Sequence, residues 1–132
     1  MNVINPTRLR HQADAILIQA AAVQNTWYTV LAAQTRVARV YLISLVIGTA
    51  NETLEISVTV DGVTLAGALN ATFGTVYRIE FNYGITAESL NIGTTRDSTY
   101  IIEGSNVSVA VRKTTNAGAG TLSCIVKYAL RY

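Results

Sequence analysis

Charged residues are scarce in this sequence. They make up 14% of its 132 residues, whereas roughly 25% is typical of soluble domains. A chain of this length forms one domain with a real hydrophobic core, but it is too short for two such domains. So few charges leave two interpretations: the exposed faces are neutral and polar, or partner subunits cover much of the surface. We favour the second, because several apolar runs have no obvious solvent side.

A concentrated positive charge is also missing. The net charge is only +2, and the ten Lys and Arg residues are scattered along the chain, whereas nucleic-acid binding usually needs a clustered basic face. Long hydrophobic runs are absent too. The best apolar stretch, residues 40–47, is far shorter than the ~20 residues that a membrane-spanning helix requires. We therefore expect no nucleic-acid partner and no membrane partner.

Cysteine and histidine each occur once, so the usual reactive constellations have few members. A single cysteine allows no internal disulfide, and Cys124 sits in an alternating strand pattern where it behaves as a small buried hydrophobe. His11 has no second histidine or cysteine to complete a metal site. No spacing singles out a carboxylate pair. We predict that the protein is not an enzyme and has no catalytic residue, cofactor or metal.

What the sequence does contain is strand signal. Residues 53–60 alternate without exception between apolar Leu54, Ile56, Val58 and Val60 and polar residues, which is the period of a strand with one buried face. Asp61-Gly62 follows at once and a further apolar segment begins at Val63. Asp-Gly between alternating segments predicts a β-hairpin with a type I′ turn.

The segment 37–47 is apolar on both faces apart from Arg39 and Ser44. Strands buried on both faces have this composition, but an antiparallel sandwich normally leaves one face in water. We expect a neighbouring subunit or the N-terminal segment to cover the outer face. Arg39, Tyr41 and Ile43 are the residues predicted to bind that partner.

Residues 1–15 hold the only proline and show no strand period, so we predict an N-terminal arm, with Arg8, Arg10 and His11 as its partner-binding residues. Residues 16–23 combine helix-favouring Ala and Gln with strand-favouring Ile and Leu, and we interpret them as a strand. With the later alternating segments, the sequence predicts an all-β chain: a single antiparallel β-sandwich over residues 16–132, jelly-roll-like, with about eight strands.

Two segments resemble a pattern in small virion structural proteins of tailed bacteriophages. These are TWYTVL at 26–31 and VTVDGV at 58–63, which flank the apolar segment that begins at Val37. The resemblance covers about residues 16–69, and its motifs are mainly those of β-hairpins. In size and architecture the chain also looks like the cement, or decoration, proteins that clamp capsid shells. No binding residue of that family can be carried over to a position in this chain.

The resemblance implies a non-enzymatic protein on the outer capsid surface of a virion, made in the host cytoplasm. Its expected partners are the major capsid protein and further copies of itself, as a dimer or trimer. The alternative is a jelly-roll module of a phage tail or fibre that binds a cell-surface glycan, with Tyr83 as the contact, because Tyr83 stands beside Gly84 at the predicted end of a strand.

Overall fold

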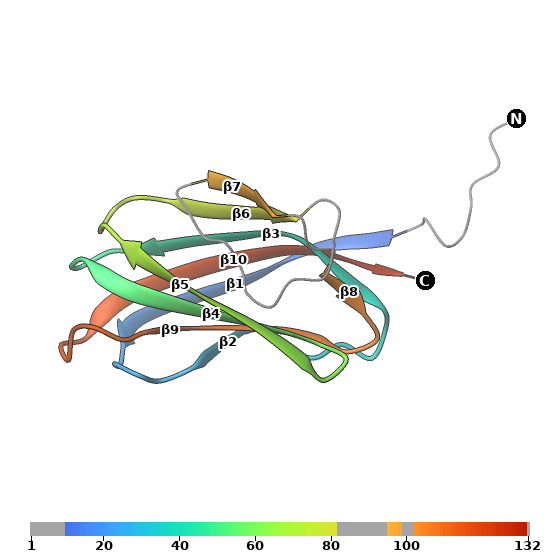
Figure 1. Cartoon of the computed structure of the whole chain (residues 1–132), viewed down its shortest axis with the longest axis horizontal. Helices are drawn as coiled ribbons and strands as arrows, with labels where there is room; N and C mark the ends of the chain where they lie inside the picture. The colour runs from blue at the N-terminus through green and yellow to red at the C-terminus, as the bar shows by residue number, and fades with distance from the viewer. Residues whose placement is uncertain (1–9, 82–94, 99–101, 132) are drawn as a thin grey trace, which may run out of the picture.

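In the computed structural model of the chain, residues 10–81, 95–98 and 102–131 are described, and they contain ten strands and no helix. Figure 1 shows the strands stacked in two layers. In chain order they are β1 Arg10–Ala22, β2 Tyr28–Leu31, β3 Ala38–Ile47, β4 Glu52–Val60, β5 Val63–Ala71, β6 Tyr77–Phe81, β7 Thr95–Ser98, β8 Ile102–Gly104, β9 Val107–Lys113 and β10 Gly120–Arg131.

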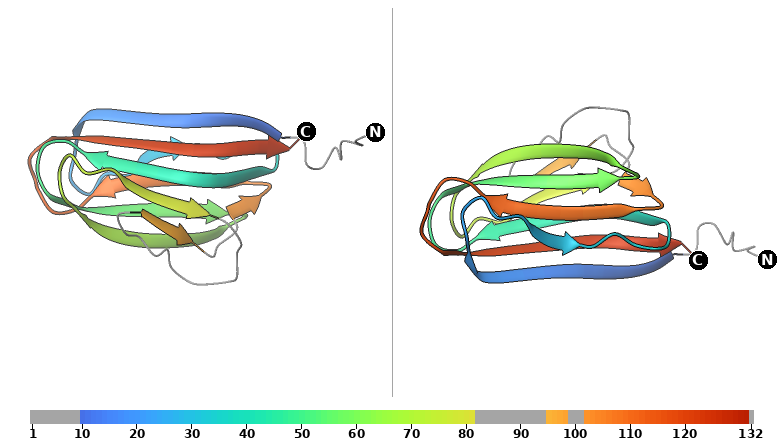
Figure 2. Two further views of the ribbon diagram at one scale, coloured as in Figure 1. Left: turned by 90° about the horizontal axis from the view of Figure 1, so that it is seen from above. Right: turned by 90° about the horizontal axis from the view of Figure 1, so that it is seen from below.

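The two layers are a larger sheet in the order β1-β10-β3-β6-β7, in which β8 also pairs with β3, and a smaller sheet in the order β2-β9-β4-β5. Figure 2 shows the larger sheet from one side and the smaller sheet from the other. All pairings are antiparallel except that of β6 with β7. The predicted all-β sandwich is confirmed.

The strand order also identifies the type of sandwich. Without the short β7 and β8, eight strands remain, and each strand of the first half pairs with its counterpart from the second half: β1 with β10, β2 with β9, β3 with β6, and β4 with β5. A chain folded back on itself as a double ribbon and then wound into two sheets gives this order, which is that of a jelly roll.

The core lies between the two sheets and follows from alternation along each strand. In β4, the side chains of Leu54, Ile56 and Val58 are fully buried, while the polar residues between them are half-buried on the outside. β9 contributes Val107, Val109 and Val111 in the same way. Apolar burial of this kind is the main favourable contribution to folding, and here it is achieved without a disulfide, since Cys124 is a free thiol.

The predicted hairpin between β4 and β5 is confirmed by its backbone. Asp61 and Gly62 both have positive φ, 48° and 86°, as a type I′ turn requires. Val60 pairs with Val63 directly beside the turn. The Asp61 carboxylate also accepts a hydrogen bond from the backbone N–H of Asn106, over 2.9 Å, and thereby ties this turn to the β8–β9 connection.

The predicted boundary between an arm and the sandwich at residue 15 is wrong. β1 begins at Arg10, which lies opposite Arg131 of β10, and pairing continues to Gln19 before a β-bulge. Residues 10–15 are therefore part of the sandwich. The sequence lacked a strand period there because β1 lies at a sheet edge, where small and polar residues such as Ala13 and Asp14 are tolerated on both faces.

A β-bulge in β3 overturns the expectation for Ile43. Lys127 of β10 lies opposite Leu42, but the next residue, Tyr128, lies opposite Val40, so Tyr41 is an extra residue in β3. The bulge reverses the alternation. Simple alternation put Ile43 on the outer face with Tyr41, whereas Ile43 is fully buried in the core.

Candidate interaction surface

The face of the larger sheet that points away from the smaller sheet, called the outer face here, carries a strip of apolar side chains. Two rows of neighbouring residues cross β1, β10 and β3, in that order. One row is Ile18, Ser123 and Val46, and the other is Ile16, Ile125 and Ser44. Val76, just before β6, is 47% exposed. We call these residues the apolar strip: Ile16, Ile18, Val46, Val76 and Ile125.

The apolar strip is open to solvent at both of its ends. Ile16 is 62% exposed and Ile18 is 72% exposed, so most of each side chain contacts water. Between them and Val76 the surface forms a shallow hollow of about 280 Å³. Its lining is Ser44, Leu45, Val46, Val76, Arg78, Ser123, Cys124 and Ile125. Contiguous apolar surface of this kind is a common feature of interaction sites.

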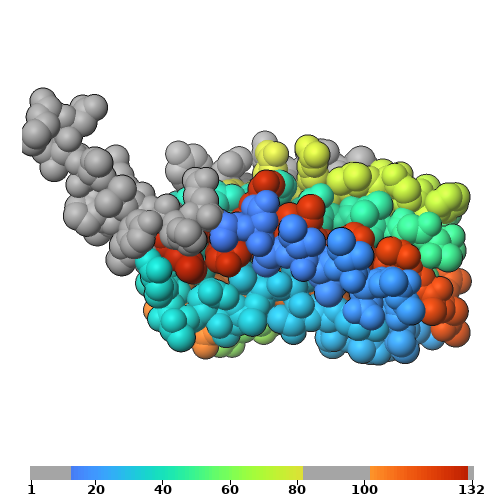
Figure 3. All heavy atoms as spheres, turned by 180° about the vertical axis from the view of Figure 1, so that it is seen from behind, coloured from blue at the N-terminus to red at the C-terminus, as the bar shows by residue number. Residues whose placement is uncertain are grey.

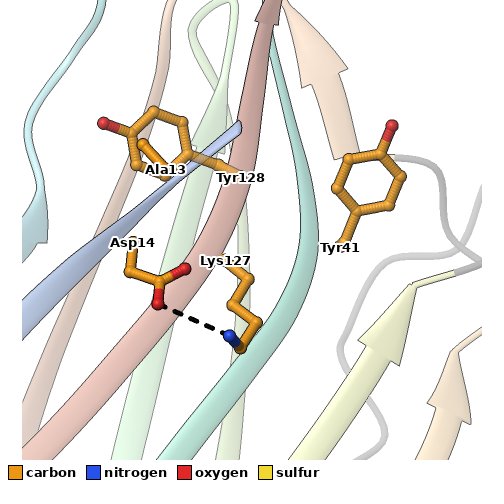
Figure 4. A pocket seen from close by; sticks show the side chains of 5 residues that line it. All are labelled: Ala13, Asp14, Tyr41, Lys127 and Tyr128. Atoms are coloured by element: carbon orange, nitrogen blue, oxygen red, sulfur yellow. Dashed lines mark hydrogen bonds and ion pairs between the residues drawn. The ribbon is translucent and has the colours of Figure 1, made fainter. Parts of the chain in front are cut away.

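Charged and aromatic residues border the apolar strip on the side toward the N-terminal end of β1. Lys127 Nζ lies 3.4 Å from Asp14 Oδ2, with both side chains about half exposed, and such surface pairs contribute little to stability. Figure 4 shows this pair, which joins Asp14 of β1 to Lys127 of β10, together with Tyr41 on the neighbouring strand β3. Ala13 and Tyr128 complete the lining of a second hollow there. The strip thus has a polar rim on this side, as protein interfaces commonly do.

Two of the predicted partner-binding residues come together at this rim. The Arg39 guanidinium lies 5.2 Å from the centre of the Tyr41 ring, within the range of a cation–π contact, and Arg39 also lies opposite Glu103 of β8. Both Arg39 and Tyr41 are half-buried. Ile43, the third residue predicted on β3, belongs to the core and is not part of this surface.

The other predicted site residues are placed only in part. Arg10 and His11 form the start of β1, where their backbones lie opposite Arg131 and Leu130, and their side chains are outside the description. Arg8 and Tyr83 lie outside the described residues.

The outer face of the smaller sheet has a different character. Polar side chains alternate along β4, and Glu55 Oε1 accepts a hydrogen bond from Arg112 Nε of β9 over 3.0 Å and lies 2.8 Å from Arg112 Nη2. The same guanidinium lies 4.5 Å from the centre of the Trp27 ring. This face is held by local contacts between its own side chains, so the apolar strip on the larger sheet is the better candidate for binding a partner.

The residue pair that sequence analysis missed lies at one end of the core. Lys113 is fully buried and Glu52 is 5% exposed, with Nζ and Oε2 3.4 Å apart. The Lys113 ammonium also donates to the carbonyl oxygens of Asn116 and Gly118, each at 2.6 Å. These bonds fix the loop between β9 and β10.

Glu52 completes the same network from β4. Its carboxylate accepts hydrogen bonds from the backbone N–H groups of Thr115 and Asn116 and from the Asn116 side-chain amide. Burial raises the pKa of Glu52, but these hydrogen bonds and the Lys113 charge outweigh it and leave the pKa below its usual value of 4.5. The arrangement is that of a structural ion pair, because the carboxylate and ammonium are satisfied by each other and by the loop.

A signal for this pair was present in the alternation. Glu52 is in phase with buried Leu54 and Ile56, and Lys113 is in phase with buried Val109 and Val111. Two opposite charges at inward positions of strands that turn out to be neighbours indicate a buried pair.

The described residues offer no other reactive centre. Within residues 10–81, 95–98 and 102–131, no three His, Cys, Asp or Glu side chains lie together in a way that could hold a metal ion. Cys124 is 1% exposed, and burial raises its pKa to about 12. No helix in this part of the chain is long and apolar enough to cross a membrane.

Comparison with known proteins adds little to this description. No protein-family model and no curated protein matches the chain. One similar solved structure comes from a study of Bacillus endospore appendages, a novel family of disulfide-linked pili. It is 10% identical, with a TM-score of 0.48, over 99% of this chain and 96% of that one.

Proposed function

We propose that this protein is a virion structural protein of a tailed bacteriophage that binds the outside of the capsid shell and stabilises it, with the major capsid protein as its partner. The observation that carries the proposal is the apolar strip on the outer face of the larger sheet. The resemblance of segments 26–31 and 58–63 to small phage virion proteins gives the proposal its biological setting.

The physical support is the contrast between this face and a normal solvent face. An antiparallel sheet with one side in water usually carries polar side chains there, and the smaller sheet does so. The larger sheet instead exposes Ile16, Ile18 and Val76. Burying one such side chain against a partner contributes about 1–2 kcal/mol, so several of them, in many copies on a shell, give firm attachment through avidity.

The structure changes which residues are expected to take part. Ile43 is excluded because it lies in the core. Arg39 and Tyr41 remain candidates at the rim, beside the Asp14–Lys127 pair. The apolar contacts are now assigned to Val46 and Ile125, on β3 and β10, and to Val76 at the end of the apolar strip farther from β1.

The test is co-sedimentation with empty shells assembled from the major capsid protein of the same genome. Wild-type protein should pellet with the shells and raise the temperature at which they break. Val76→Asp should reduce binding at least tenfold, because burying a carboxylate in an apolar contact is unfavourable.

The matched control is Val63→Asp. Val63 is 64% exposed at the start of β5, in the other sheet, so this variant introduces the same charge away from the proposed contact and should bind like wild type. Failure of the wild-type protein to pellet, or equal loss of binding in both variants, would contradict the proposal.

A further inference from the structure

β1 is an edge strand whose outer side has no partner among the described strands. The larger sheet begins with β1, and β1 pairs only with β10. In Figure 2 no described strand lies beyond β1 in either view, and in Figure 3 its side chains lie at the surface, shown in blue. A long edge strand is a ready template for pairing with another strand.

The register shows which backbone groups are available along that edge. Thr121 of β10 directs both its N–H and its C=O toward the β3 side, where they bond Thr49 Oγ1 at 3.1 Å and the Gly48 N–H at 2.9 Å. In an antiparallel strand these groups alternate in direction from one residue to the next. Cys124 therefore directs its N–H and C=O toward Leu17, its partner in β1.

The same alternation along β1 gives the direction of its own groups. Leu17 bonds β10, so Ile16 and Ile18 direct their N–H and C=O groups away from β10, toward the open side. Their side chains lie on the outer face, 62% and 72% exposed. The edge therefore presents free backbone groups and apolar side chains at the same two residues.

The usual protections of an edge are weak here. Natural edge strands are blunted by Pro, by Lys, by inward-pointing charges or by short length. β1 has 13 residues and no proline or lysine, and the bulge between Gln19 and Ala22 lies beyond the two isoleucines. Asp14 is the one acidic residue of β1, and it is engaged by Lys127 of its own chain.

We propose that β1 pairs antiparallel with β1 of a second copy of this chain, about a two-fold axis at Leu17, so that the two larger sheets become one continuous sheet. This register sets Ile16 of each copy opposite Ile18 of the other, and it sets Asp14 opposite Ala20. A two-fold interface uses the same patch on both copies, and the Ile-Leu-Ile centre of β1 is self-complementary in this way.

Neighbouring registers are less favourable. An axis at Ile16 sets Asp14 opposite Ile18 and leaves only one Ile–Ile pair, and an axis at Asp14 brings two carboxylates together, which is destabilising across strands. An axis at Leu17 retains both Ile–Ile pairs and separates the two Asp14 carboxylates. The dimer does not depend on shell binding, because it uses the edge of the sheet and not the centre of the outer face.

The first test is the mass of the full chain in solution by sedimentation velocity. Wild type should have twice the 14.2 kDa of one chain. Ile16→Pro should be monomeric, because proline removes the outward N–H but is tolerated at a strand edge. Ile16→Ala is the matched control: it keeps the N–H and should still dimerise. A monomeric wild type, a dimeric Ile16→Pro protein, or filaments in place of dimers would overturn the proposal.

The second test fixes the register and does not depend on how the proline variant folds. In the proposed pairing, Ile16 and Ile18 of different copies are hydrogen-bonded partners about 5.5 Å apart at Cα, a separation that a disulfide spans. Two copies of Ile16 lie more than about 7 Å apart. Oxidising a mixture of Ile16→Cys and Ile18→Cys proteins should therefore give a mixed disulfide dimer.

Neither variant alone should cross-link. The native thiol of Cys124 should not form disulfides between copies, because this residue is only 1% exposed. Cross-linking of either variant alone, or no cross-linking of the mixture, would overturn the register. Loss of shell binding in Val76→Asp with dimers intact would show that the two surfaces act separately.

Discussion

Lys113 Nζ and Glu52 Oε2 lie 3.4 Å apart at a place where both side chains are almost completely withdrawn from solvent. The pair joins β9 to β4 within the smaller sheet and holds the loop that leads to β10. Attraction between buried charges is strong, but so is the unfavourable free energy of removing each from water. Such a pair is therefore most sensitive to the loss of one member.

Glu52→Gln should lower the free energy of unfolding by about 3–5 kcal/mol, because the Lys113 charge stays buried without its counter-ion. Urea denaturation followed by circular dichroism measures this. Glu55→Gln is the control, since the Glu55–Arg112 pair is partly exposed and should contribute under about 1 kcal/mol. Equal losses of unfolding free energy in the two variants would show that burial does not make the Glu52–Lys113 pair more important for stability than the partly exposed pair.

Glu52 should also make stability depend on pH in acid. Its folded-state pKa is below its usual value, so its contribution is present above the unfolded-state pKa and is lost as pH falls through the folded-state pKa. The free energy of unfolding of wild type should therefore fall more steeply than that of Glu52→Gln between about pH 5 and pH 3. Parallel curves from denaturation at several pH values would contradict this.

Ile43→Ala should destabilise the fold by about 2–5 kcal/mol, because it leaves a cavity in a fully packed core. Val63→Ala, at a 64% exposed position, should change stability by less than about 1 kcal/mol. Both values come from the same urea titrations. A small effect at Ile43 together with loss of shell binding would restore Ile43 to the partner surface.

Gly104→Ala should destabilise the fold by about 1–3 kcal/mol through overpacking. A Cβ at this position would meet Asp61 Oδ2 at 2.5 Å and Val60 Cγ1 at 2.8 Å, and Asp61 holds the Asn106 N–H. Gly118→Ala is the matched control, because a Cβ there meets nothing within 4 Å. Thermal unfolding of the two variants should separate them, and equal midpoints would contradict the predicted clash.

The Cys124 thiol should resist labelling in the native protein. It is 1% exposed and its pKa is raised to about 12, so very little thiolate is present near neutral pH. A colorimetric thiol reagent should react at once in denaturant and much more slowly without it. Fast reaction in the native state would show that the larger sheet opens readily around Cys124.

The sequence was most informative where alternation and turn chemistry agreed. The period of two in β4 and the Asp-Gly turn predicted the β4–β5 hairpin, because both depend on local geometry. The same period is present in β6, where Tyr77, Ile79 and Phe81 alternate with Arg78 and Glu80 and are buried.

It was less informative where tertiary pairing decides. The bulge at Tyr41 depends on how β10 meets β3, so no local pattern in β3 reveals it, and Ile43 was assigned to the wrong face. The start of β1 at Arg10 depends on pairing with β10, whose residues lie at the other end of the chain. The candidate surface was the part least well predicted from the sequence. Of the residues predicted on β3, Arg39 and Tyr41 lie on the outer face. The apolar strip, however, is assembled from four separate segments of the chain, and no local pattern indicates that they meet.

The pairing of β1 with β10 also bears on how the molecule folds. Arg10 lies opposite Arg131, so the ends of the described chain meet in one sheet, and β10 also separates β1 from β3. Contacts between residues so distant in sequence form slowly, because a long loop must close first. During synthesis β1 stays unpaired until β10 has left the ribosome. In that interval both edges of the Ile-Leu-Ile segment are exposed, so binding by a chaperone or by a partner protects the chain most at this stage of folding.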